Sequence, residues 1–129
     1  MYIVFCIWRG KKIRSFTDLY AWQEGHKLLL AIYKETEKFP AKETFGLTNQ
    51  IRRAAVSVTS NIAEGFSGNS VKEKCQFYSM AHGSITELQN QLLIARDVGY
   101  LPKGSFDKMT RQTVVVSKLI SGLKKIRNT

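Results

Sequence analysis

Apolar residues recur every three or four positions along four long segments, the spacing that places them on one face of an α-helix. The first predicted helix covers residues 18–38, with Leu19, Trp22, Leu29, Leu30 and Tyr33 as its apolar positions. Phe39-Pro40 ends it because proline disfavours helical backbone in the residue before it. The other three helices are predicted at residues 47–64, 71–98 and 105–126. Either Ser15 or Thr17 is a suitable cap for the first helix. The β-branched and aromatic residues among the first eight leave a short strand open there.

The stretch from Arg52 to Ser70 combines a helix of small residues with a turn. Gly65 is the residue type expected just past a helix end, where the backbone becomes left-handed. Residues 67–69 are turn formers, and Ser70 with Glu73 has the spacing of a capping box that opens the next helix. Gly83 lies inside that next helix, where glycine costs about 1 kcal/mol relative to alanine. We expect a close helix crossing to be the reason for Gly83.

Four amphipathic helices with short connections predict an all-α protein, an antiparallel up-down-up-down four-helix bundle. The chain of 129 residues is long enough for one domain, which we place at residues 16–127, with a short basic N-terminal extension at residues 1–15 outside the bundle. In this topology the start of helix one, the end of helix two, the start of helix three and the end of helix four lie at one pole.

The formal charge of +10 comes from 20 basic and 10 acidic residues, and the excess lies at the two ends of the chain. Residues 16–102 are neutral, whereas residues 103–129 contain Asp107 as their one acid. Since the bundle brings both ends to one pole, we predict a basic pole that contacts the phosphate backbone of RNA or DNA, and the few aromatics there argue against base stacking. A solubility role remains the alternative. The predicted nucleic-acid-binding residues are Arg9, Lys11, Lys12, Arg14, Lys118, Lys124, Lys125 and Arg127.

The turn before the third helix has the ingredients of an anion site, because free backbone N–H groups and the positive end of a helix dipole meet there. An ordinary turn between helices is the alternative and the better supported of the two. The residues of this candidate anion loop are Ser67, Gly68, Ser70, Lys72 and Lys74.

Other chemistry finds little support in the sequence. Cys6 and Cys75 form no disulfide or metal framework by spacing, and His26 and His82 form no recognised metal motif. No nucleophile is paired with a base, so we expect a non-enzymatic protein without a cofactor. The first apolar run is too short to span a membrane, and its basic residues follow it, unlike those of a secretory signal. We therefore expect a cytoplasmic protein.

Several runs carry a family resemblance, in this order: Phe16-x-Asp18-Leu19-x-x-Trp22-Gln23, Phe39-Pro40-x-x-Glu43-x-x-Gly46-Leu47-x-x-Gln50-Ile51-Arg52-Arg53-Ala54-Ala55-x-Ser57, Asn61-Ile62-Ala63-Glu64-Gly65 and Ala81-x-Gly83-Ser84-x-x-Glu87-Leu88. They resemble the four-helix bundle proteins encoded in intervening sequences of 23S ribosomal RNA genes, once called S23 ribosomal proteins. The resemblance implies a homo-oligomeric ring, commonly a pentamer, and no enzymatic activity.

The same family includes or neighbours the accessory variability proteins of diversity-generating retroelements, which implies nucleic acid and a reverse transcriptase as partners. A ring that recruits a protein partner without binding nucleic acid is the alternative function. Asn61, Glu64 and Gly65 belong to the family motif, and we interpret them as structural. Glu64 lies in the last turn of its helix, where its charge opposes the helix dipole, so we expect it to accept a hydrogen bond or ion pair.

Overall fold

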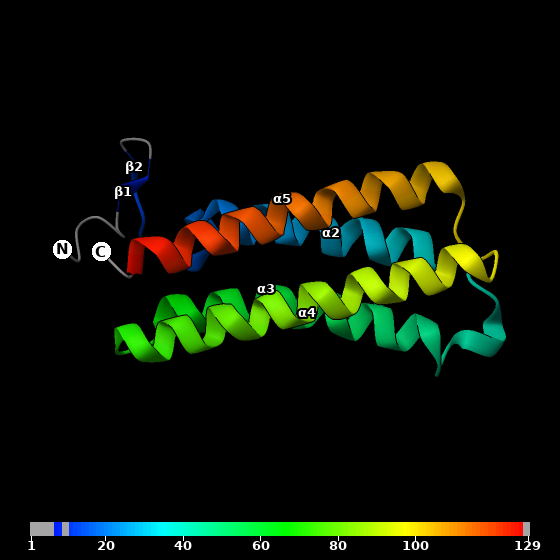
Figure 1. The fold of residues 1–129 in the computed structure, drawn as a ribbon, viewed down its shortest axis with the longest axis horizontal. Helices are drawn as coiled ribbons and strands as arrows, with labels where there is room; N and C mark the ends of the chain where they lie inside the picture. Colours follow the sequence, from blue (N-terminus) through cyan, green and yellow to red (C-terminus); the bar gives the residue numbers. More distant parts are fainter. Residues whose placement is uncertain (1–6, 9–10, 128–129) are drawn as a thin grey trace.

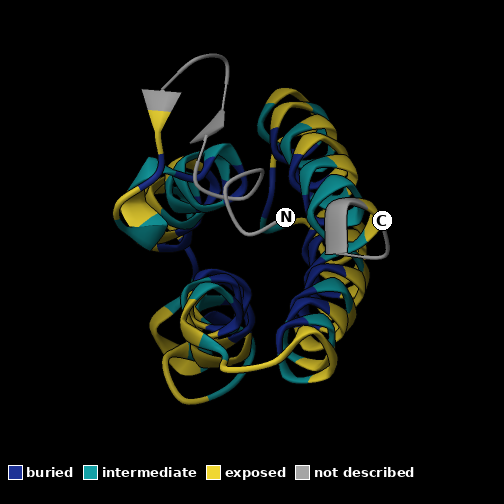
Figure 2. Cartoon of the chain, turned by 90° about the vertical axis from the view of Figure 1, so that its left-hand side faces the viewer, coloured by how far each residue is buried: buried dark blue, intermediate teal, exposed yellow. Residues whose placement is uncertain are grey.

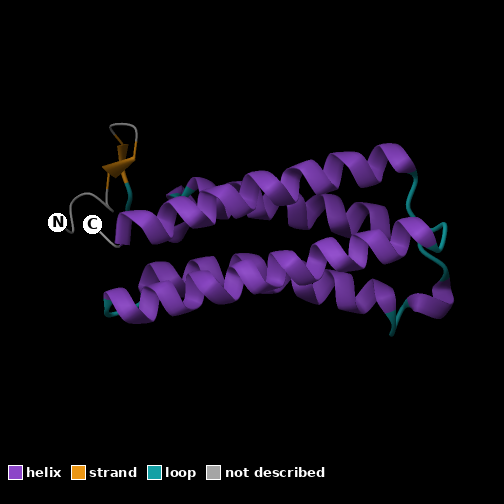
Figure 3. Cartoon of the chain, in the orientation of Figure 1, coloured by secondary structure: helices purple, strands orange, loops and turns teal. Residues whose placement is uncertain are grey.

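The computed structural model describes residues 7, 8 and 11–127, and it forms the predicted antiparallel four-helix bundle (Figures 1 and 3). The long helices are α2 (Tyr20–Thr36), α3 (Leu47–Ser67), α4 (Val71–Asp97) and α5 (Lys103–Arg127). Two short 3-10 helices, η1 (Phe16–Asp18) and η2 (Ala41–Glu43), precede α2 and α3. The fold class predicted from the periodicity is therefore confirmed, with helix bounds that differ by up to three residues.

Figure 2 looks along the bundle and shows the buried residues on the inner sides of the helices and the exposed residues on the outer sides. Each helix packs against two neighbours: α2 and α4 both contact α3 and α5. This is the neighbour relationship of an up-down-up-down topology with short connections.

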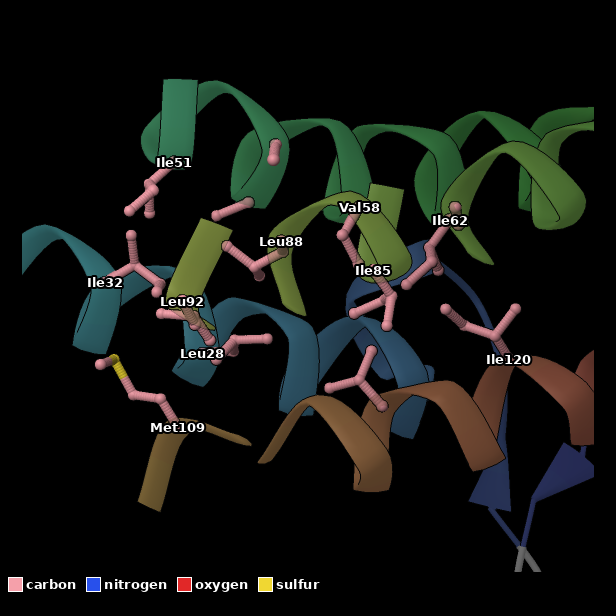
Figure 4. Close-up of a cluster of buried hydrophobic side chains, with 14 of the residues drawn as sticks. Leu28, Ile32, Ile51, Val58, Ile62, Ile85, Leu88, Leu92, Met109 and Ile120 are labelled. Atoms are coloured by element: carbon pink, nitrogen blue, oxygen red, sulfur yellow. The ribbon is translucent and has the colours of Figure 1, made fainter. Parts of the chain in front are cut away.

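The core consists of apolar residues from all four helices (Figure 4). The face predicted for the first helix is wrong, because Leu30 and Tyr33 are exposed whereas Leu28 and Ile32 are buried. Ile32, Val58, Leu88 and Ile120 are each almost wholly buried. Side chains from α2, α3, α4 and α5 meet between the helices, and on each helix buried positions recur at intervals of three or four residues.

The predicted cap Ser15 closes the short helix η1, whereas α2 begins after Leu19 without a side-chain cap. The Ser15 hydroxyl accepts the Thr17 N–H at 3.2 Å, and the Asp18 carboxylate accepts the Ser15 N–H at 3.2 Å, which closes the start of η1. Gly99 follows α4 with φ of 85°, a left-handed conformation that favours glycine. The third long helix thus ends at Asp97, within one residue of its predicted end at residue 98.

The N-terminal extension forms a small antiparallel hairpin of β1 (Ile7–Trp8) and β2 (Lys11–Lys12). Ile13, directly after β2, is buried and belongs to the hydrophobic core. The chain therefore reaches the core at Ile13, three residues before the predicted start of the bundle domain at residue 16. An apolar side chain beside the bundle is stabilised by burial whether or not it belongs to a long helix.

Candidate nucleic-acid interface

The pole predicted from the topology exists in the structure. Figure 1 shows the start of α2, the end of α3, the start of α4 and the end of α5 at the same end of the bundle. The N-terminal hairpin lies at this end as well. Basic segments separated by most of the sequence are therefore brought to one end of the molecule.

The predicted cations at this pole differ in how accessible they are. The side chains of Lys12, Arg14, Lys118 and Lys125 are exposed. Arg9 lies outside the described residues, and so do the side chains of Lys11 and Arg127. Lys118 lies nine residues before the last residue of α5, or about 14 Å along the axis at 1.5 Å per residue, so it extends the basic surface away from the pole.

Lys124 differs from its neighbours because it is partly buried against α4. Its ammonium lies 3.3 Å from Nδ1 of His82, so the ammonium donates and the ring nitrogen accepts. The other ring nitrogen, Nε2, then carries the proton and donates to the Ser117 carbonyl oxygen at 3.0 Å. Ser121 Oγ lies 3.2 Å from the same nitrogen. Lys124 thus links α5 to α4, in contrast to the exposed position expected of a phosphate ligand.

Lys74, assigned to the candidate anion loop, is also buried, with 6% of its surface exposed. Its ammonium donates to the carbonyl oxygens of Gly65, at 3.3 Å, and Phe66. These carbonyls end α3, where the helix dipole attracts a cation. The position of Lys74 on the core face of α4, one turn before Tyr78, explains this inward orientation, and its charge serves α3 rather than a ligand.

The rest of the loop is occupied in a similar way. Ser70 Oγ accepts the Glu73 N–H at 3.1 Å and caps α4. The Gly68 N–H donates to the Gly65 carbonyl oxygen at 3.2 Å, and the Ser67 hydroxyl donates to the Ala63 carbonyl oxygen at 3.4 Å. Lys72 is exposed. These bonds favour the alternative of an ordinary turn between helices.

Gly65 is not the left-handed residue that the sequence suggested, because α3 continues through it to Ser67. A Cβ atom at Gly65 would lie 2.4 Å from Cε1 of Tyr78 on α4. Glycine is required here by the close approach of the two helices. At Gly83 the reverse holds: a Cβ atom there would meet no other group within 4 Å, so the predicted close crossing at Gly83 is wrong.

Asn61 and Glu64 have separate environments, although they lie on the same helix. Asn61 is buried, and its amide donates to the carbonyl oxygen of Ser57 at 2.8 Å and to Oγ of Ser57 at 3.1 Å. The Ser57 hydroxyl lies 2.7 Å from that of Ser84, so Asn61 supports a polar link between α3 and α4. The side chain of Glu64 is exposed, and its carboxylate forms no hydrogen bond or ion pair with any other described residue. The partner predicted for Glu64 is therefore absent from the described part of the chain.

Glu64 instead borders an open hollow of about 320 Å³ at the pole. Its lining residues are Phe16, Ala63, Glu64, Ser67, Glu73 and Phe77. Two carboxylates and two phenyl rings give this side of the pole an acidic and apolar character. The pole is thus basic on the side of α5 and acidic where α3 and α4 meet.

The opposite end of the bundle contains Glu43, an acid with a lowered pKa. The Leu47 N–H donates to Oε1 of Glu43 at 3.1 Å and holds the pKa of that carboxyl below its ordinary value, and the Tyr100 hydroxyl, at 2.9 Å from Oε2, acts in the same direction. The same bond raises the pKa of Tyr100. Glu43 thereby caps the first turn of α3, which is a structural use of the charge.

The described residues include neither a group of candidate metal ligands nor a helix that could cross a membrane. In residues 7, 8 and 11–127 no three His, Cys, Asp or Glu side chains are grouped so that they could hold a metal ion. The helices in this part of the chain are too short or too polar to cross a membrane.

Comparison with known proteins decides the family. The family model described as "23S rRNA-intervening sequence protein" matches residues 17–122. The chain belongs to this family. A solved structure from Bacteroides thetaiotaomicron, a protein of unknown function from the S23 ribosomal protein family, is similar with a TM-score of 0.75 and 16% identity. The similarity covers 81% of this chain and 95% of that one, and it supports the fold alone. The comparison with curated proteins gives no match.

Two exposed cations of this 23S rRNA-intervening sequence protein were missed in the sequence. Lys108 and Arg111 lie on the outer side of α5, the side that also carries Lys118 and Lys125. The signal was the spacing along α5: Arg111 follows Lys108 by three residues, and Lys118 and Lys125 follow at intervals of seven. This is the period of the buried positions, shifted to the opposite face of the helix. Lys108, Arg111 and Lys118 fall within the region that the family model matches, whereas Lys124 and Lys125 follow it.

Proposed function

We propose that this member of the family binds the phosphate backbone of RNA or DNA. The supporting observation is a set of exposed basic side chains without acidic partners. The ion pairs among the described residues involve Lys27, Lys38, Arg96 and Lys103. Lys12, Arg14, Lys118 and Lys125 take part in none of them and are exposed. Cations without acidic neighbours are available to neutralise phosphates and release counterions.

A binding role fits the described residues better than a catalytic one. Both histidines have structural contacts: His26 stacks on Trp22 with ring centroids 4.7 Å apart, and His82 bonds to α5. The perturbed carboxyl of Glu43 caps a helix. We therefore assign no reaction to the chain, and a partner such as a reverse transcriptase would supply the chemistry in the complex.

We further propose that the protein is a homo-oligomer, with a pentameric ring as the form that the family resemblance implies. Phe45 is 94% exposed, Leu30 is 57% exposed and Met80 is 52% exposed, and large apolar side chains of this kind are candidates for subunit contacts. A ring would repeat the cations and increase the number of phosphates contacted.

The same apolar residues support a second function, a ring scaffold that recruits a protein partner without nucleic acid. The two functions differ in a simple observable. Binding of nucleic acid through phosphates weakens steeply with salt, whereas an apolar protein interface does not.

The test is electrophoretic mobility shift with 30-base-pair RNA and DNA duplexes at 50 and 200 mM salt. We expect binding at low salt and a plot of log affinity against log salt with slope near −0.9 for each phosphate neutralised on duplex DNA. Absence of binding to both duplexes at low salt would overturn the nucleic-acid function and favour the scaffold. Light scattering on the same sample measures the oligomer mass, and a monomer would contradict the ring.

A further inference from the structure

The outer face of α5 carries a series of cations that extends well beyond the pole. We infer that duplex nucleic acid lies along this face and is held by Lys108, Arg111, Lys118 and Lys125, which we call the α5 stripe. The inference rests on the proposed function and names its contact surface. It differs from the basic pole, because half of the stripe lies far from the helix end at Arg127.

Helix geometry places the four cations on one face of α5. At 100° per residue they fall within a sector of about 100°, and Lys108 and Lys125 are about 26 Å apart along the axis. All four side chains are exposed, whereas Met109, Thr113, Val116 and Ile120 are buried on the opposite side of the helix. The stripe therefore faces directly away from the core.

Contacts on both flanks fix this orientation. On one side Gln89 of α4 donates to the Thr113 hydroxyl at 3.0 Å, and His82 bonds to Ser117. On the other side Gln112 donates to the Glu24 carbonyl oxygen of α2 at 2.9 Å. With α4 and α2 held on these two flanks, the sector between them that contains the stripe is left to solvent.

One acid, Asp107, falls within the same sector of α5 as the stripe, one turn before Arg111. Asp107 is the one acidic residue of α5, and its carboxylate lies 3.4 Å from the ammonium of Lys103. On the neighbouring α2, Glu24 pairs with Lys27 at 2.9 Å. None of the stripe residues takes part in the ion pairs found among the described residues. At the pole, by contrast, Glu64 and Glu73 border the hollow, and Lys74 and Lys124 are engaged by the protein itself.

The chemistry between the cations indicates phosphate as the ligand. Val115 and Gly122 separate them, and a Cβ at Gly122 would meet no other group within 4 Å, so a nucleic-acid backbone can approach closely there. Phe106 is the one aromatic residue of α5, and it is buried, which leaves no stacking platform for single-stranded bases. The four cations are held along about 26 Å of one rigid helix, and a rigid duplex can follow this length without first being ordered, whereas a flexible strand cannot.

The decisive experiment compares two double charge reversals that change the net charge equally. Lys108→Glu with Arg111→Glu removes the half of the stripe far from the pole. The control, Lys34→Glu with Arg53→Glu, changes one exposed lysine and one exposed arginine on α2 and α3 that also lie outside the ion pairs found among the described residues. Affinity for the RNA and DNA duplexes is measured at 50 and 200 mM salt, and circular dichroism checks that both variants stay helical.

We expect the stripe variant to bind about ten-fold more weakly, or worse, with a salt slope reduced by about 2, since each lost phosphate contact contributes about 0.9. The control should stay within about two-fold of the unchanged protein. A milder variant, Lys108→Gln with Arg111→Gln, should show the same reduction in slope if charge reversal unfolds the helix.

The outcomes separate the inference from the proposed function. An equal loss in both reversals would mean that net charge alone governs binding, and the stripe would be refuted. A loss confined to reversals at Lys12 and Arg14 would refute the stripe and keep nucleic-acid binding at the pole. No duplex binding by the unchanged protein would refute the proposed function. Polyglutamate that competes as well as unlabelled duplex would identify a general polyanion surface and would overturn the assignment to a duplex.

Discussion

The contact between Gly65 of α3 and Tyr78 of α4 predicts opposite effects for one substitution at two helical positions. Alanine at Gly65 would place its Cβ 2.4 Å from Cε1 and 2.7 Å from Cδ1 of the tyrosine ring, too close for any real pair of carbons. Alanine at Gly83 meets open space on the exposed side of α4. Both positions lie inside helices, so both substitutions gain the same helix propensity.

The expected change in the free energy of unfolding combines the gain in helix propensity with the cost of overpacking. The propensity gain is about 1 kcal/mol in each case. Overpacking at Gly65 costs about 1–3 kcal/mol, because the buried ring or the neighbouring helix must shift. Gly65→Ala should therefore lower the free energy of unfolding by up to about 2 kcal/mol, and Gly83→Ala should raise it by about 0.5–1 kcal/mol. For a domain of this size, 1 kcal/mol corresponds to about 4 °C in Tm.

Thermal and urea unfolding followed by circular dichroism measure both variants against the unchanged protein. A double-mutant cycle with Tyr78→Leu tests the cause. Without the tyrosine ring, Gly65→Ala should lower the free energy of unfolding less than it does in the unchanged protein, so the double variant should lose less than the sum of the two single variants. If Gly65→Ala stabilised the protein as much as Gly83→Ala does, the close contact between α3 and α4 would not exist as described.

Three further predictions concern charges with structural roles. Lys74→Met should lower the free energy of unfolding by about 1.5–3 kcal/mol, because the α3 carbonyls lose a charged donor, while exposed Lys72→Met should change it by less than about 0.5 kcal/mol in urea titrations. Arg52→Lys should cost about 1 kcal/mol by loss of the bonds to the end of α2, at 2.9 and 3.3 Å, whereas Arg53→Lys should be neutral in the same assay. The hydrogen bonds that lower the pKa of Glu43 stabilise the folded state when its carboxyl is charged. This contribution is complete at pH values above the unfolded-state pKa and disappears as pH falls through the lower folded-state pKa. Glu43→Gln should therefore flatten the acid limb of a stability–pH profile, and an unchanged limb would contradict the cap.

The fold could be predicted from the sequence because its information is local. The 3–4 spacing of Val58, Ile62 and the matching positions of α4 and α5 indicates which faces are buried, and four amphipathic helices have few ways to cover one another. In α2 the run 28–30 offers a leucine to several faces, so the spacing did not identify the buried one. Caps such as Ser70 and stops such as Gly99 act within a few residues, so their residue types reveal the helix ends.

The site was harder to predict because its features depend on how neighbouring helices align. The role of Gly65 follows from the ring that faces it across α3 and α4, and no local pattern gives that alignment. Lys74 falls on the core face of α4 by spacing, yet a lysine is ordinarily placed at the surface, and only the α3 carbonyls nearby explain its burial. Lys108 and Arg111 could have been found, since the period of the cations along α5 is visible in the sequence.

The α5 stripe and the most exposed apolar side chains among the described residues lie on different elements, and this separation bears on how the proposed functions relate. The α5 stripe faces away from the core between α4 and α2. The two most exposed large apolar side chains among the described residues are Leu30 on α2 and Phe45 in the turn before α3. Subunits that met through Leu30 and Phe45 would keep their stripes free, so oligomerisation would multiply phosphate contacts instead of covering them. The ring and the nucleic-acid interface are therefore compatible in one chain, and substitutions at Phe45 should change oligomer mass without lowering the number of phosphates that each remaining subunit neutralises.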